Sequence, residues 1–169
     1  ARAPYQARKA AARQNMAANG GLQAVGRSPG RVPATPTTVR LPMREILLVA
    51  DLPWVADAVR AGLDGAGCHL ATVAEPAAAA AWWEEHRPEV VLVDLQIGSR
   101  GGMAVVRDLR AAAQAAGVAP PPTIVLLDRA VDSFLARRAG AAAWIRKPFN
   151  GFALRRLVDR VTVEGRAAG

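Results

Sequence analysis

From residue 44 onward, short aliphatic runs alternate with amphipathic segments, and this alternation constrains the fold more than any other feature of the chain. The runs at 46–50 and 90–93 are wholly apolar, as expected of strands buried on both faces of a sheet. The segments between the runs carry apolar residues at helical spacing. We expect five strands, at 45–50, 68–73, 89–94, 123–127 and 142–146, and five helices, at 53–64, 75–86, 103–116, 131–139 and 150–163.

Five strand–helix repeats are typical of a doubly wound α/β fold, in which helices cover both faces of one parallel sheet. With right-handed crossovers, the flavodoxin-like strand order 2-1-3-4-5 places the ends of the first and third strands beside the point where the order reverses. Asp51 follows the first strand and Asp94 ends the third. We therefore expect a site at the carboxyl edge of the sheet.

Three charged residues stand at strand ends: Asp51, Asp94 and Lys147. Two carboxylates and an ammonium suit a divalent cation plus a phosphoryl group, because Mg²⁺ takes oxygen ligands and bridges carboxylate to phosphate. Asp51 could instead cap the following helix, and Lys147 before Pro148 could be a simple strand exit. Asp94 has no comparable structural explanation, and the three residues together favour the site.

The positive charge is concentrated in the N-terminal part of the chain. Residues 1–43 carry seven basic side chains and no acidic one, so the remainder is nearly neutral although the whole chain has a formal charge of +8. Tyr5 is the only aromatic residue there, and no nucleic-acid motif is present. We predict a disordered extension and linker over 1–42, with a marginal helix at 6–18, and no nucleic-acid binding. Met43 stands just before the first strand. As an alternative, residues 1–42 could therefore come from a translation start assigned upstream of the native one.

The rest of the composition indicates a soluble intracellular domain over 43–164, with 165–169 as a tail. Cys68 is the only cysteine, so no intrachain disulfide can form. The chain contains neither an apolar run of membrane-spanning length nor the apolar core of a secretory signal. We expect a cytoplasmic protein without a membrane partner; the oligomeric state stays open.

Three sequence pieces carry a family resemblance: Leu-Val-Ala-Asp-Leu-Pro at 48–53, Val-Leu-Val-Asp at 91–94 with Gly102 eight residues later, and Ala-Gly-Ala at 139–141 leading to Lys-Pro-Phe at 147–149. In this order and spacing, residues 44–163 resemble the receiver domain of bacterial response regulators. The resemblance implies that a histidine kinase or phosphotransfer protein phosphorylates Asp94. It also implies that Asp51, Asp94 and the backbone carbonyl of Gln96 bind Mg²⁺, and that Lys147 contacts the phosphate.

Three positions depart from the family pattern. Ala50 replaces the first of two adjacent acids, which should weaken Mg²⁺ binding. Asp128 stands where the family has Ser or Thr after the fourth strand, and its charge would repel a phosphate. The switch aromatic of the fifth strand is Trp144, which lacks a hydroxyl. We assign Asp128 and Trp144 as the switch positions, with plain core packing as the alternative for Trp144.

The leading hypothesis is a stand-alone receiver that signals by contact with an unknown output protein and is no enzyme beyond self-phosphorylation and autodephosphorylation. The alternative is a pseudo-receiver, a protein-binding module that works without phosphorylation. A flavodoxin-like enzyme or nucleotide binder is disfavoured, because the chain has neither GxxxxGK[ST] nor GxGxxG, and Asp51-Leu52-Pro53-Trp54 follows the first strand in place of a phosphate loop.

Overall fold

The computed structural model describes residues 43–167. The predictions for 1–42, including the helix at 6–18, lie outside the described residues. Within the described part, no helix has the length and apolar character needed to cross a membrane.

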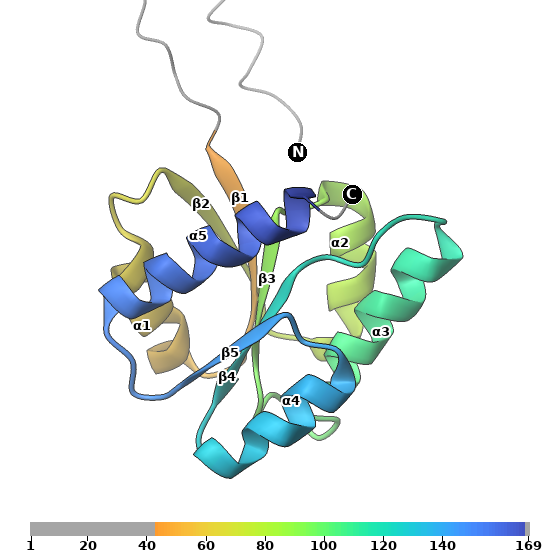
Figure 1. Ribbon diagram of the computed structural model, residues 1–169. Helices are drawn as coiled ribbons and strands as arrows, with labels where there is room; N and C mark the ends of the chain where they lie inside the picture. The colour runs from red at the N-terminus through yellow and green to blue at the C-terminus, as the bar shows by residue number, and fades with distance from the viewer. Residues whose placement is uncertain (1–42, 168–169) are drawn as a thin grey trace, which may run out of the picture. The chain divides into compact units, whose positions relative to one another are not determined.

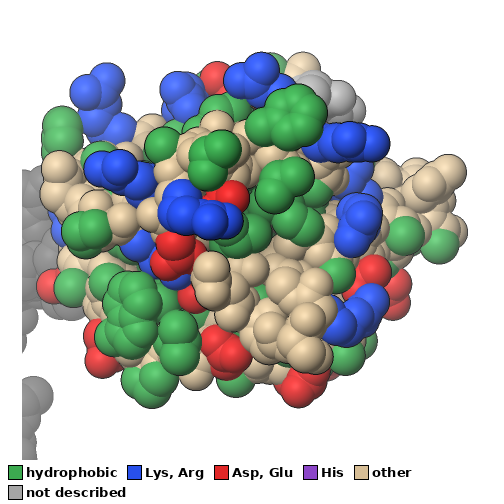
Figure 2. Space-filling view, turned by 90° about the horizontal axis from the view of Figure 1, so that it is seen from below, with side chains coloured by type: hydrophobic (Ala, Val, Ile, Leu, Met, Phe, Trp, Pro, Cys, Tyr) green, Lys and Arg blue, Asp and Glu red, His purple; other side chains and the backbone are tan. Residues whose placement is uncertain are grey.

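The strands form one parallel sheet in the order β2-β1-β3-β4-β5, which confirms the predicted topology. The strands are β1 (Arg44–Val49), β2 (Cys68–Val73), β3 (Val90–Asp94), β4 (Thr123–Leu127) and β5 (Ala143–Arg146). Every residue of β3 and β4 is buried, which explains the apolar runs at 90–93 and 124–127. All strands run toward the lower edge of the molecule in Figure 1, and Figure 2 shows that edge from below.

The helices cover both faces of the sheet. They are α1 (Pro53–Leu63), α2 (Ala79–His86), α3 (Gly102–Ala115), α4 (Ser133–Ala139) and α5 (Gly151–Ala167), with 3₁₀ turns η2 (Pro76–Ala78) before α2 and η3 (Ala130–Asp132) before α4. Helix α5 continues to Ala167, past the predicted helix end at 163 and into the segment 165–169 that was assigned as a tail. The extra turn stays in contact with the domain, because a Cβ at Gly165 would lie 2.6 Å from Pro122 Cγ.

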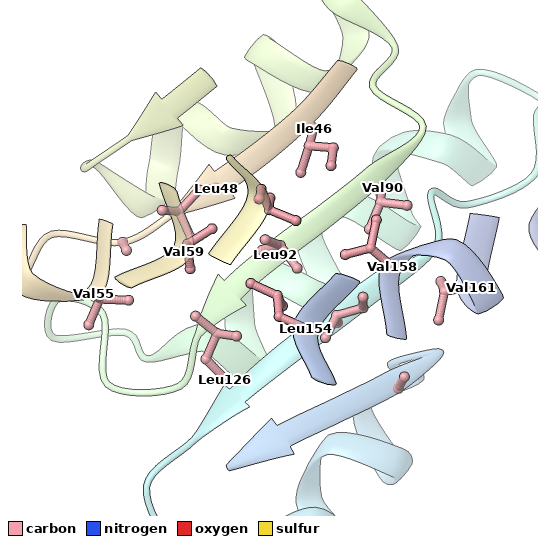
Figure 3. Packing of buried hydrophobic residues seen from close by; sticks show 14 residues of the cluster. Ile46, Leu48, Val55, Val59, Val90, Leu92, Leu126, Leu154, Val158 and Val161 are labelled. Carbon is pink, nitrogen blue, oxygen red and sulfur yellow. The ribbon is translucent and has the colours of Figure 1, made fainter. Parts of the chain in front are cut away.

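Separate apolar clusters fill the two sides of the sheet. The cluster in Figure 3 joins one face to α1 through Val55 and Val59 and to α5 through Leu154 and Val158. On the other face, α2 and α3 pack over a second cluster that includes Trp83, while a smaller third cluster joins α3, α4 and β4. Trp83 is buried and Trp82 is partly exposed. Packing on both faces fixes the strands whose ends carry the charged residues.

Gly102 brings the start of α3 directly against the end of β3. A Cβ at this position would overlap the backbone oxygen of Asp94 and lie 3.0 Å from Leu95 Cα. The Gly102 backbone N–H donates to the Leu95 carbonyl at 2.9 Å. The missing side chain thus allows the loop after β3 to turn tightly beside Asp94.

Candidate functional site

Asp94 is the wholly buried last residue of β3, and its two carboxylate oxygens have different surroundings. Oδ1 accepts a hydrogen bond from Lys147 Nζ at 2.6 Å and another from the Gln96 backbone N–H at 3.3 Å. Oδ2 is buried and has no hydrogen-bond partner among the described residues. A buried carboxylate oxygen without a partner is costly, so Oδ2 is the atom of the site most in need of a ligand.

Lys147 lies between two carboxylates. Its buried Nζ is 2.6 Å from Asp94 Oδ1 and 3.2 Å from Asp128 Oδ1, and 5.2 Å from the centroid of the Trp54 ring. The Lys147 backbone N–H donates to the Leu127 carbonyl at 2.7 Å, which holds the residue beside the end of β4. The two acids and one ammonium leave this cluster with a formal charge of −1.

Asp51 connects the end of β1 to the loop after β3. Its Oδ2 accepts a hydrogen bond from the Gly98 backbone N–H at 3.0 Å, while the side chain remains exposed. The alternative that Asp51 caps α1 is wrong, because Leu52 occupies the N-cap position and no side chain caps the helix. Ala50, the residue before Asp51, is buried. Its methyl group occupies the position at which the family resemblance implies an acidic side chain.

The remaining predicted residues have distinct positions. Gln96 is exposed in the loop after β3, and its backbone N–H donates to Asp94. Asp128 is part of the site because it pairs with Lys147. Trp144 is partly buried beside the α3–α4 cluster, with the Arg137 guanidinium 5.3 Å from its ring centroid. Its role as a switch stays a prediction.

Trp54 also lies at the site, although the sequence pattern did not indicate it. The ring is about half exposed in the first turn of α1 and lies close enough to Lys147 for a cation–π contact. Trp54 follows Asp51 by three residues, and the first turn of a helix that follows a strand lies at the same edge of the sheet as the end of that strand. This spacing was the signal that could have placed Trp54 at the site.

The donor set fits a Mg²⁺ ion that keeps several waters. Asp94 and Asp51 each supply a carboxylate, Asp94 with unused acceptor capacity, and the Gln96 carbonyl belongs to the loop after β3. Mg²⁺ is commonly held by one or two carboxylates with water completing its octahedron. Within 43–167, no cluster of three or more His, Cys, Asp or Glu side chains is placed to hold a metal. In Figure 2, acidic and basic side chains adjoin near the centre of this edge.

The chain resembles known proteins both in sequence and in fold. The family model described as the response regulator receiver domain matches residues 46–161. Transcriptional regulatory protein KdpE of Mycobacterium tuberculosis is 33% identical over 109 residues, which cover 63% of this chain and 46% of that protein. The chain thus spans about half the length of this curated relative.

Two solved structures share the fold. The receiver domain of sensor histidine kinase PA1611 from Pseudomonas aeruginosa, with a magnesium ion coordinated in its active site cleft, is 29% identical, with a TM-score of 0.62 and coverage of 70% of this chain and 97% of that one. Chemotaxis response regulator CheY4 of Vibrio cholerae is 24% identical, with a TM-score of 0.61 and coverage of 70% and 98%.

Proposed function

Because this chain belongs to the response regulator receiver domain family of two-component signalling, we propose that Asp94 accepts a phosphoryl group in a Mg²⁺-dependent reaction. The observation that carries the proposal is the asymmetry of the Asp94 carboxylate. Lys147 holds Oδ1 at 2.6 Å, whereas Oδ2 is buried without a partner. One oxygen is thus fixed in place and the other is left to react.

The chemistry follows from these contacts. Oδ2 attacks phosphorus, the new O–P bond forms, and the bond from phosphorus to the donor's leaving atom breaks, so that the leaving group departs with the electron pair. Lys147 keeps the nucleophile oriented and then supplies positive charge to the phosphoryl oxygens. A bound Mg²⁺ would neutralise further charge on those oxygens.

Asp128 opposes the product. Asp128 shares the Lys147 ammonium with Asp94. An incoming phosphoryl group needs this ammonium but finds it already paired with the Asp128 carboxylate. One additional unit of like charge at about 4 Å costs roughly 1–4 kcal/mol, at effective dielectric constants between those of water and of a protein surface. We therefore expect Asp94 to be a slow phosphoacceptor whose phosphorylated state is less favoured than in a pocket with a hydroxyl at position 128.

The test is the intact mass of the protein after incubation with acetyl phosphate and Mg²⁺. We expect a gain of one phosphoryl group that disappears in Asp94→Asn and in the presence of a chelator. Asp94→Asn keeps the size of the side chain, and circular dichroism checks its fold. If the folded wild-type chain gains no mass from acetyl phosphate or from a panel of histidine kinases, the proposal fails.

A second candidate is the phosphorylation-independent binding module. Two features favour it: Lys147 is already neutralised by Asp94 and Asp128, and Ala50 removes a carboxylate from the site. This candidate requires that binding of an output protein be the same for wild type and Asp94→Asn. The stand-alone organisation, the kinase donor, the non-enzymatic character and the cytoplasmic location stay predictions.

A further inference from the structure

The outer surface of α3 and α4 has two adjoining hollows away from the Asp94 site. Their volumes are about 460 and 470 Å³. Arg107 and Ala139 line both hollows, so the two form a continuous groove, which we call the α3–α4 groove. The first hollow is also lined by Arg110, Ala111, Gln114, Val118 and Pro120, and the second by Met103, Leu135 and Arg138.

Three arginines give the groove a positive charge that no lining residue offsets. Arg107, Arg110 and Arg138 lie in it, and no Asp or Glu does. The nearby acids are engaged elsewhere: Asp108 pairs with Arg100 and Asp132 with Arg129, each at 3.1 Å. The groove therefore offers three guanidinium groups to an external anion.

Gly140 leaves room for one of these guanidinium groups, that of Arg110. It ends α4 with a φ of +89°, and a Cβ there would lie 2.8 Å from Arg110 Nη1. Arg110 Nη1 also donates to the Gly140 carbonyl at 3.4 Å. Arg110 thus reaches across the end of α4 and lies against Gly140.

Apolar side chains accompany the arginines. Leu135 is 49% exposed and Val118 46% exposed, and Met103 packs on the small cluster between α3 and α4. A ligand that fills the groove must therefore combine negative charge with apolar groups.

We propose that the α3–α4 groove binds an acidic peptide segment of another protein, with carboxylates on the arginines and an aliphatic side chain between Met103 and Leu135. The basic residues at 1–43 are accompanied by no acid, so this part of the chain has the wrong charge to occupy the groove. No aromatic side chain lines the groove, so it lacks the stacking surface on which nucleic-acid bases are held. This partner surface is separate from the phosphorylation of Asp94.

The test uses the full chain and a short fluorescent peptide of alternating Glu and Leu, with binding measured by anisotropy at low salt. We expect Arg107→Glu/Arg138→Glu to weaken binding about tenfold or more, because two charge-assisted contacts become repulsive. The matched control is Arg156→Glu/Arg160→Glu, which makes the same charge change on exposed positions of α5 and should alter affinity less than about twofold. Circular dichroism checks that both variants are folded.

Three further measurements distinguish an acidic, partly apolar peptide from other possible ligands of the α3–α4 groove. A peptide with Ser in place of Leu should bind several-fold more weakly, and equal binding would overturn the apolar anchor. A single-stranded oligonucleotide that binds more tightly than the peptide through Arg107 and Arg138 would replace the peptide with nucleic acid. A dimer seen by light scattering that the groove variant abolishes would assign the groove to a second copy. Absence of peptide binding, or equal losses in the groove and α5 variants, would refute the proposal.

Discussion

At the scale of single residues, the Lys147 ammonium is shared between the carboxylates of Asp94 and Asp128. Lys147 Nζ is closer to Asp94 than to Asp128, at 2.6 Å against 3.2 Å, and the Asp128 side chain is 35% exposed whereas that of Asp94 is wholly buried. Water can therefore solvate Asp128 when the lysine moves, but it cannot solvate Asp94. Asp128 is thus the partner that can be removed at little cost to the fold.

Replacing Asp128 with Ser tests its opposition to phosphorylation. The substitution removes a charge that repels the phosphoryl group and supplies a hydroxyl that can donate to it. We expect the phosphorylated fraction at a fixed acetyl phosphate concentration to rise by about threefold or more. Asp57→Asn, which removes a carboxylate on the exposed face of α1, is the control and should leave this fraction unchanged. An unchanged or smaller fraction in Asp128→Ser would contradict the role assigned to Asp128.

Replacing Ala50 with Asp tests the missing carboxylate. Ala50 is only 3% exposed, so an added acid close to Asp51 should destabilise the metal-free protein by about 1–3 kcal/mol. The same acid should tighten Mg²⁺ binding, because it adds an oxygen donor to the site. Thermal unfolding with and without Mg²⁺ measures both effects: the variant should melt lower without the ion and gain more than wild type when it is added. A variant that gains no more than wild type would place the metal elsewhere.

At the scale of the elements, the strands and their order were predictable from the sequence. Hydrophobic runs and turn residues mark each strand within a short stretch of sequence, and right-handed crossovers limit the possible orders. The sequence also placed Asp51, Asp94 and Lys147 at one edge, since parallel strands end together. The contacts made by these side chains were not predictable from the pattern. The bond from Gly98 to Asp51 and the pairing of Lys147 with Asp128 depend on the paths of two loops, and loop paths follow from packing rather than from periodicity.

Gly102 is the point where α3 and β3 meet most closely, so Gly102→Ala tests how that contact positions Asp94. Because the new methyl group would overlap the Asp94 carbonyl, we expect a loss of about 1–3 kcal/mol in the free energy of unfolding and slower phosphorylation. Gly117→Ala is the control: its φ is +68°, and no atom lies near the added Cβ. This control should cost about 1 kcal/mol in backbone strain and leave phosphorylation unchanged. Slowing by both variants would mean that Gly102 has no specific role.

At the scale of the whole molecule, charge is divided unevenly along the chain. Seven of the 22 basic residues precede Arg44 and all 14 acidic residues lie after it, so the formal charge of +8 comes almost entirely from the first part. Such a charge acts at long range and mainly accelerates encounter with an acidic partner, whereas the α3–α4 groove would act after contact. The two effects are therefore expected in different rate constants.

Substitution of these seven basic residues by Gln in the full chain tests the long-range effect; they are Arg2, Arg8, Lys9, Arg13, Arg27, Arg31 and Arg40. We expect association with the Glu–Leu peptide to slow by about tenfold at low ionic strength, because steering by charge of this size changes association rates by roughly 10–10³-fold. At about 1 M salt the Debye length falls to about 3 Å, so the rates of the variant and wild type should converge. Stopped-flow anisotropy gives both rate constants, and Arg107→Glu/Arg138→Glu is the comparison, because it should chiefly accelerate dissociation. If the Gln variant associates as fast as wild type at low salt, the charge of residues 1–43 plays no part in capturing an acidic partner.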